Sequence, residues 1–170
     1  GTQEYYLYKR GRLTKLNLSG RLIHLTINDA GLIAGTSFPT GLFASDTRAF
    51  RFSPFSNART LLHPEPGDAL TWAQGINRRG DVLGYSFVSG GRERIGVWRG
   101  TSFRTYFTQG TPEFPGGSNV LLWNEPGLIV VTQTGSKSYV VPRPGVRIFS
   151  PRKSPTELIS LLNQPAVCTP

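Results

Sequence analysis

The sequence has no methionine, one cysteine and only two histidines. Because Cys168 is alone, an intrachain disulfide, a CxxC pair and a cysteine-based zinc cluster are excluded. His24 and His63 have no carboxylates at ligand spacing, so we expect neither a metal site nor a cofactor. A run of apolar residues long enough to span a membrane is also lacking, which predicts no membrane span.

A signal peptide is absent as well. The lack of methionine even at position 1 favours a processed piece of a longer precursor, and a piece of this kind would lack its signal peptide even if it were secreted. Charged residues amount to only 17% and form no long acidic or basic tract, which argues against wholesale disorder. The chain is long enough for one substantial core, and two full domains are not expected.

Positive charge exceeds negative charge by a wide margin. There are 19 Lys and Arg residues against 10 Asp and Glu residues, giving a net charge of +9. An anionic partner is therefore physically reasonable, whether an acidic polysaccharide, a cell surface or, with less support, a nucleic acid. The alternative is that scattered arginines only keep the protein soluble. The abundance of Gly (20) and Pro (13) favours short strands joined by tight turns over long helices.

Three segments share an Asn-x-x-Gly pattern followed by apolar residues, at 27–37, 76–86 and 123–133. Their asparagines are 49 and 47 residues apart. Each segment predicts a β-hairpin in which the Asn side chain accepts a hydrogen bond from the backbone two residues on. The Gly then takes a left-handed conformation without a Cβ clash. These turn residues are Asn28, Gly31, Asn77, Gly80, Asn124 and Gly127. Pro126 predicts a distorted third hairpin.

A second hairpin, here called the aromatic hairpin, occurs in four copies between these segments. The copies lie near 5–18, 49–62, 96–106 and 139–149, and they alternate apolar and polar residues as half-buried strands do. The spacing from Tyr8 to Leu13 is repeated from Trp98 to Phe103. One unit thus contains an aromatic hairpin followed by an Asn-x-x-Gly hairpin, which makes four strands in about 48 residues.

The repeat predicts an all-β fold, a β-propeller-type array of about 3.5 four-stranded antiparallel blades. The units fall near 5–47, 48–93 and 94–137, with a half unit at 138–150. Together they form a β-repeat domain at 1–150, followed by a Pro-containing tail at 151–170. The alternative is a β-trefoil, although the fourth aromatic hairpin counts against it.

The repeats resemble the HAF-repeat family of bacterial extracellular proteins. Residues 75–86, Gly-Ile-Asn-Arg-Arg-Gly-Asp-Val-Leu-Gly-Tyr-Ser, match its Gly-Ile-Asn-x-x-Gly segment closely, and residues 26–37 nearly so. The family's His-Ala-Phe is reduced to Arg48-Ala49-Phe50, and Val131 replaces the second glycine of the third copy. The resemblance covers about residues 5–150. It implies a propeller-like secreted or cell-surface protein with no defined activity.

Candidate binding residues are one tryptophan and a group of arginines. Trp72 stands beside a predicted loop, where its ring could stack on a sugar, although packing in the core is the alternative. Arg78, Arg79, Arg92, Arg94 and Arg99 come from the second and third units and could meet an anion, or could simply be solvated turn residues.

No catalytic motif is present, and no acid recurs at a fixed repeat position. We therefore expect a non-catalytic extracellular β-repeat module for binding or assembly, not an enzyme. It would complete a propeller with a longer or partner chain, or with a second copy that brings the total to seven blades. The alternatives are a carbohydrate-binding lectin-like module, a nucleic-acid-associated protein and, with least support, a glycosidase with paired carboxylates.

Overall fold

In the computed structural model every regular element of the described residues is a β-strand, which confirms the predicted all-β class. The structure describes residues 3–39, 44–88 and 92–108 and the strand segments 118–123, 129–133, 137–141 and 147–148. The chain divides into two compact units, residues 1–115 and 116–170. Within the described part, no helix of the length and apolarity needed to cross a membrane is found.

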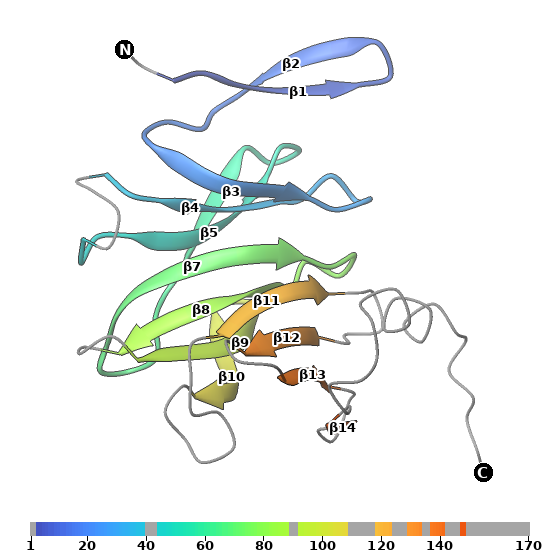
Figure 1. Cartoon of the computed structure of the whole chain (residues 1–170). Helices are drawn as coiled ribbons and strands as arrows, with labels where there is room; N and C mark the ends of the chain where they lie inside the picture. Colours follow the sequence, from blue (N-terminus) through green and yellow to red (C-terminus); the bar gives the residue numbers. More distant parts are fainter. Residues whose placement is uncertain are drawn as a thin grey trace. The chain divides into compact units, whose positions relative to one another are not determined.

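The first unit contains one two-stranded hairpin and two four-stranded sheets (Figure 1). The hairpin pairs β1 with β2, and the sheets have the orders β3-β4-β5-β6 and β7-β8-β9-β10. Its strands are β1 (Tyr5–Lys9), β2 (Arg12–Leu16), β3 (Leu22–Ile27), β4 (Ile33–Ser37), β5 (Arg48–Ser53), β6 (Ala58–Leu62), β7 (Asp68–Ile76), β8 (Val82–Val88), β9 (Glu93–Arg99) and β10 (Ser102–Thr108).

The second unit is described by its backbone strands. They are β11 (Ser118–Trp123), β12 (Ile129–Gln133), β13 (Lys137–Val141) and β14 (Arg147–Ile148), which form one antiparallel sheet in that order. Asn124, Pro126, Gly127, Cys168 and the predicted tail at 151–170 lie outside the described residues.

The four-stranded antiparallel sheets of the prediction are confirmed, but they group the strands half a repeat later than the expected units. Each sheet begins with the strand pair of an Asn-x-x-Gly hairpin and ends with an aromatic hairpin. The two-stranded remainder is therefore β1–β2, and the segment expected as a half unit at 138–150 contributes β13 and β14 to a complete sheet. A sequence period fixes the length of a repeat, whereas hydrogen bonding between strands decides where each sheet starts. The sheets are open, and closure into a propeller ring stays a prediction.

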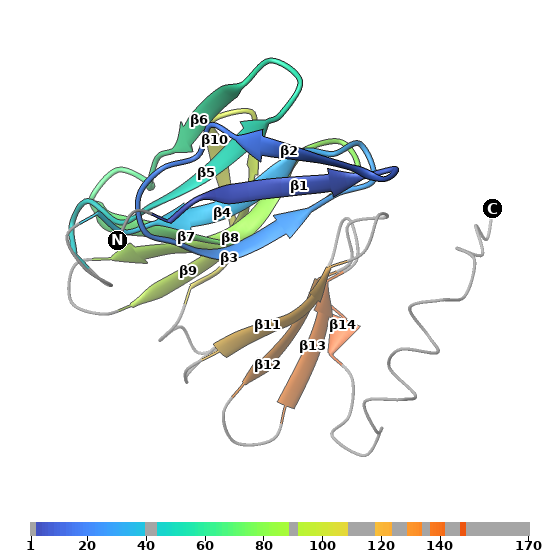
Figure 2. The same cartoon turned by 90° about the horizontal axis from the view of Figure 1, so that it is seen from above.

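The sheet β3–β6 is apolar on both faces, and neighbouring elements cover both. One face contributes Ile33, Phe50 and Phe52 to a core that is completed by the β1–β2 hairpin and its connection to β3, through Leu16 and Leu18. Figure 2 shows this hairpin lying across the strands of that sheet. Burying each of these side chains stabilises the fold by about 1.5–3 kcal/mol.

The opposite face of the same sheet packs against β7–β10. Ala34, Ala49 and Leu62 meet Val82 and Trp98 in a second core. Both Phe52 in the first core and Trp98 in the second are fully buried. Successive side chains of β4 and β5 point to opposite faces of the sheet. Because the residues on both faces are apolar, the sheet packs against a neighbour on each side and neither face is left to solvent.

Threonine hydroxyls connect these two sheets by buried hydrogen bonds. Thr71 Oγ1 on β7 accepts from the Ala49 N–H (2.8 Å) and donates to the Leu62 carbonyl (2.9 Å). In the other direction, Thr36 Oγ1 on β4 accepts from the Ala73 N–H (3.0 Å). These bonds satisfy backbone groups that would otherwise lose water without a replacement partner.

Candidate anion-binding surface

The first Asn-x-x-Gly turn is a tight hairpin closed by both backbone and side chain. The Gly31 N–H donates to the Asn28 carbonyl (2.8 Å), and Gly31 has a φ of +82°. The Asn28 side-chain oxygen accepts from the Leu32 N–H at 2.9 Å. This is the turn followed by a left-handed residue that the sequence predicts.

The second turn repeats this geometry. Gly80 has a φ of +84° and donates its N–H to the Asn77 carbonyl (2.9 Å). The Asn77 Oδ1 atom accepts from the Asp81 N–H (2.9 Å). The expected role of the asparagines as acceptors in both turns is therefore confirmed, with one correction. The donor is the backbone four residues on, not two, because the side chain spans the entire turn including its glycine.

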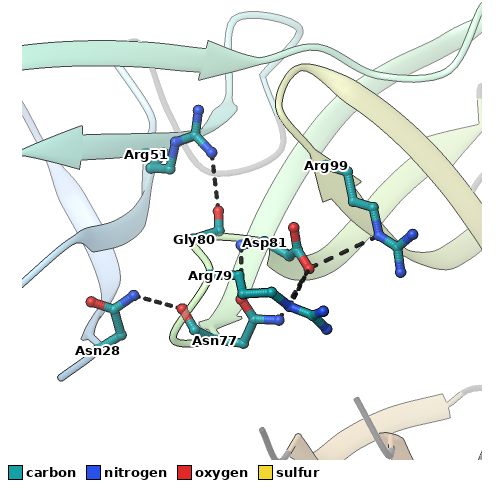
Figure 3. A network of polar contacts seen from close by, with 7 residues as sticks. All are labelled: Asn28, Arg51, Asn77, Arg79, Gly80, Asp81 and Arg99. Atoms are coloured by element: carbon teal, nitrogen blue, oxygen red, sulfur yellow. Dashed lines mark hydrogen bonds and ion pairs between the residues drawn. The ribbon is translucent and has the colours of Figure 1, made fainter. Parts of the chain in front are cut away.

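The two turns are also bonded to each other, as Figure 3 shows. The Asn28 side-chain amide donates to the Asn77 carbonyl at 2.6 Å. Beside it, Arg51 on β5 donates from Nη1 to the Gly80 carbonyl at 3.1 Å. Equivalent turns of successive sheets are thus held side by side by an amide and a guanidinium.

A single carboxylate lies among the cations of this network. Asp81 Oδ2 accepts from the Asn77 side-chain amide (3.1 Å) and lies 3.9 Å from the Nε atoms of both Arg79 and Arg99 (Figure 3). Both guanidiniums belong to exposed residues. One carboxylate shared by two arginines leaves this corner of the protein with an excess of positive charge.

The turns of the aromatic hairpins lie at the same end of the unit. Within each sheet, antiparallel pairing brings the turn of the aromatic hairpin to the end that carries the Asn-x-x-Gly turn. Between layers, Lys9 at the β1–β2 turn lies 5.6 Å from the ring centroid of Phe55 in the β5–β6 turn. We call this end, with the turns near 10–11, 28–31, 54–57, 77–80 and 100–101, the turn surface.

Charge is distributed unequally between the two ends of the first unit. Of the described side chains, the turn surface has eight basic residues and two acids, namely Lys9, Arg10, Arg12, Arg51, Arg59, Arg78, Arg79, Arg99, Asp29 and Asp81. The opposite end balances five of each, namely Lys15, Arg21, Arg48, Arg92, Arg94, Glu4, Asp46, Glu65, Asp68 and Glu93. The remaining basic residue of this unit, Arg104, lies within β10 between the two ends, with its guanidinium carbon 5.6 Å from the Tyr106 ring centroid. The excess cationic charge of the unit is therefore concentrated at one end.

Two features of the turn surface bear on what it can bind. The Phe55 side chain is 74% exposed and offers a flat apolar face among the cations. Arg59 is half-buried, with its guanidinium carbon 4.3 Å from the Phe50 ring centroid, and burial lowers its pKa. An anion placed next to Arg59 would offset that desolvation. Guanidiniums with free N–H groups suit carboxylate and sulfate groups, which they bind with two parallel hydrogen bonds.

The arginines proposed from the sequence are divided between the two ends. Arg78, Arg79 and Arg99 belong to the turn surface. Arg92 is exposed beyond the far end of β8, and Arg94 forms an ion pair with the buried Asp68 at 3.7 Å. The fold therefore does not unite the five arginines into one site.

Trp72 lies in the middle of the nine-residue strand β7, not beside a loop as expected. Its ring is half-buried between two aromatic neighbours, His24 on β3 and Phe87 on β8, each with a centroid distance of 5.7 Å. The loop expectation failed because β7 continues to Ile76, four residues beyond the tryptophan. A role of Trp72 in stacking on a sugar stays a prediction.

Several residues of the turn surface were not singled out by the sequence, among them Lys9, Arg10, Arg12, Arg51 and Arg59. They come from the first two aromatic hairpins, at positions that do not correspond between the two copies, so no motif joins them. A signal was nevertheless present in the sequence. Successive turns of an antiparallel meander alternate between the two ends of the sheet, and basic residues outnumber acidic ones around only one set of turns.

The first unit also contains a pocket without charged residues. An apolar pocket of about 180 Å³ lies between the β1–β2 hairpin and β3, lined among others by Tyr5, Leu7, Leu25 and Ile27. Its lining offers no charged group, so the pocket does not suit an anion.

The described residues hold no group of three or more His, Cys, Asp or Glu side chains that could bind a metal ion. The described groups that the turn surface offers to a ligand are therefore arginine and lysine side chains and one exposed aromatic ring.

Comparison with protein-family models, with curated proteins and with solved structures gave no match for this chain.

Proposed function

We propose that this chain is a non-catalytic, extracellular β-repeat module that binds an acidic polysaccharide on its turn surface. The observation that supports this most strongly is the imbalance of eight basic residues against two acids at one end of the first unit. A surface with this excess attracts polyanions through their summed charge, without any single deep pocket.

The arrangement of the cations favours a polymer over a small anion. They come from three successive layers, the β1–β2 hairpin and the two sheets behind it, as Lys9, Arg51 and Arg79 illustrate. Stacked sheets are about 10 Å apart, so these charges extend over a distance that a linear polyanion can follow. Exposed Phe55 adds a face on which a sugar ring could pack.

The layered architecture supports a propeller-type arrangement as the finer description of the fold. Sheets that are apolar on both faces stay soluble only when neighbours cover each face, and the sheet β3–β6 is covered in this way. The resemblance to an extracellular repeat family supports the proposed location.

The direct test is binding of fluorescently labelled galacturonic acid oligomers, followed by anisotropy. The variant Arg78→Gln with Arg79→Gln removes two charges from the turn surface, and we expect its affinity to fall about tenfold or more. The matched control, Arg21→Gln with Arg92→Gln, removes two exposed charges from the opposite end. It should bind within about twofold of the wild type.

Equal losses in the two double variants would mean that only net charge matters, and would overturn the proposed site. A single-stranded polynucleotide of matched charge serves as the competitor. If it binds the turn surface much more tightly than the oligouronate, the nucleic-acid alternative replaces the polysaccharide. Release of shortened oligomers from the probe would instead point to the glycosidase alternative.

A further inference from the structure

The β1–β2 hairpin corresponds to the last two strands of each four-stranded sheet. Tyr8 pairs with Leu13 across a turn just as Trp98 pairs with Phe103 in the β9–β10 hairpin. The strand β1 is thus the counterpart of β5 and β9. What the hairpin lacks is the strand pair that precedes it in the complete sheets.

In every complete sheet, the counterpart of β1 is paired on its other edge with the second strand of an Asn-x-x-Gly hairpin. The registers are the same, with Phe52 opposite Ile33 in β4 and Trp98 opposite Val82 in β8. The backbone of the second unit follows this rule too, since β13 pairs with β12. Among the described strands, β1 pairs with β2 alone.

The free edge of β1 has backbone groups ready for such a partner. The turn at Arg10 and Gly11 has positive φ at both residues, and it joins the directly opposed pair Lys9 and Arg12. In a hairpin of this kind the pair next to the turn exchanges hydrogen bonds, and every second residue along the strand does the same. The N–H and C=O groups of Tyr6 and Tyr8 therefore point away from β2.

The outer face of the hairpin is likewise exposed, and three apolar side chains lie on it beside the ion pair of Lys15 and Glu4. Tyr8, Leu13 and Tyr6 are 70%, 62% and 48% exposed. The counterparts of Tyr8 in the sheets, Phe52 and Trp98, are fully buried because the preceding layer packs on them. The same position is thus buried wherever a layer precedes it and exposed where none does.

We propose that the edge of β1 and the face formed by Tyr6, Tyr8 and Leu13 bind an Asn-x-x-Gly hairpin of this same repeat type. Its second strand would add antiparallel to β1, with an apolar residue opposite Tyr8. The sequence of that strand would resemble Ile33–Ser37 of β4 and the first five residues of β8, which read apolar-apolar-Gly-x-Ser.

A second copy of this chain fits the site less well than a separate repeat hairpin. The three strands of the right type, β4, β8 and β12, are already paired on both sides within their own sheets. The sequence predicted that two copies share a seven-bladed ring. Each copy, however, has an aromatic hairpin as its incomplete sheet, and two aromatic hairpins do not make one complete sheet. This inference does not depend on the turn surface and stands or falls separately from anion binding.

The test uses a labelled synthetic peptide with the sequence of residues 22–37, added to the full chain. We expect saturable binding, and slowing of hydrogen exchange at the Tyr6 and Tyr8 amides by about tenfold or more. Tyr8→Pro removes one outward N–H while leaving the β1–β2 ladder intact, since proline is tolerated at an edge. It should weaken peptide binding about tenfold or more, whereas Tyr8→Thr, which keeps the N–H, should weaken it far less.

Several results would overturn the proposal. A scrambled peptide of the same composition that binds equally well would show non-specific adhesion. Tyr6 and Tyr8 amides that are already protected in the chain alone would show an occupied edge. Self-association that Tyr8→Pro abolishes would assign the edge to β1 of a second copy. Equal thermal stability of the wild type and Tyr8→Pro excludes unfolding as the cause of any loss.

Discussion

The side-chain amide of Asn28 donates to the backbone carbonyl of Asn77, 49 residues away, at 2.6 Å. The oxygen of the same side chain accepts from the Leu32 N–H within its own turn. One residue therefore shapes its hairpin and holds the equivalent hairpin of the next sheet. This dual use links the local turn chemistry of the repeat to the stacking that brings the arginines of the turn surface together.

The two roles of Asn28 can be separated by substitution. Asn28→Asp keeps the turn acceptor and replaces the inter-sheet donor, so we expect it to lower the free energy of unfolding by about 1–2 kcal/mol. Asn28→Ala removes both roles and should cost about 1–3 kcal/mol. Asn17→Asp, at an exposed position, is the matched control. Urea denaturation measures all three, and an Asn28→Asp protein as stable as the control would contradict the inter-sheet link.

The hydroxyl of Thr71 is predicted to be a stabilising contact between the two sheets. Thr71→Val leaves the Ala49 N–H and the Leu62 carbonyl without this partner, and we expect a loss of about 1–3 kcal/mol. Thr26→Val is the comparison, because the Thr26 hydroxyl is buried with no hydrogen-bond partner among the described residues. That change should be neutral or stabilising. Equal losses of unfolding free energy in the two variants would indicate that the Thr71 hydroxyl stabilises the fold by packing and not by its hydrogen bonds.

The second glycines of the first two repeats, Gly35 and Gly84, should tolerate alanine to different degrees. A Cβ at Gly84 would lie 1.9 Å from the Trp72 carbonyl oxygen, a backbone atom that cannot move without disturbing β7. A Cβ at Gly35 would instead meet two side chains and no backbone atom. The end of Leu25, at 2.6 Å, can rotate away, and the Phe50 ring, at 3.0 Å, must shift slightly. We expect Gly84→Ala to cost about 3 kcal/mol or more and Gly35→Ala about 1 kcal/mol. Thermal denaturation measures which variant is less stable. A Gly35→Ala protein less stable than Gly84→Ala would contradict the packing described.

Burial raises the pKa of Glu93 above its ordinary value of about 4.5. The folded protein then keeps this proton to a higher pH than the unfolded chain, so stability falls as pH rises from about 4.5 through the raised pKa. Glu93→Gln should remove this fall and leave the variant more stable than wild type at neutral pH. Denaturation curves between pH 4 and pH 7 measure the effect.

Glu4 provides the control of opposite sign. Its hydrogen bond from Lys15 lowers its pKa, so its contribution to stability is present above the ordinary value and lost as pH falls. Glu4→Gln should therefore lose stability at neutral pH relative to low pH. If both glutamine variants changed the pH profile in the same direction, the burial of Glu93 would not be the cause.

The elements that the sequence predicted well are those governed by neighbours in the chain. The side-chain oxygens of Asn28 and Asn77 accept from backbone N–H groups only four residues on, and the positive φ of Gly31 and Gly80 follows from the same short turns. A recurring local motif therefore predicts both the hairpins and the period.

The features that the sequence did not predict depend on contacts between residues far apart in the chain. Whether β1 or β3 begins a sheet is decided by which strand edges meet, and the two choices have the same period. The bond from Arg51 to the Gly80 carbonyl joins residues from different repeats at unrelated motif positions. Trp72 seemed to stand beside a loop because the length of β7 could not be judged from its Thr- and Gln-containing sequence.

The location of the bound polysaccharide tests the central claim most directly. Backbone amide NMR signals of the first unit would be followed during titration with a galacturonic acid oligomer. We predict that the largest shifts occur in the turns near 10–11, 28–31, 54–57, 77–80 and 100–101, and that they vanish at high salt because the attraction is electrostatic. Shifts centred instead on Trp72 or on the opposite end around Arg92 and Arg94 would contradict the assignment of the turn surface.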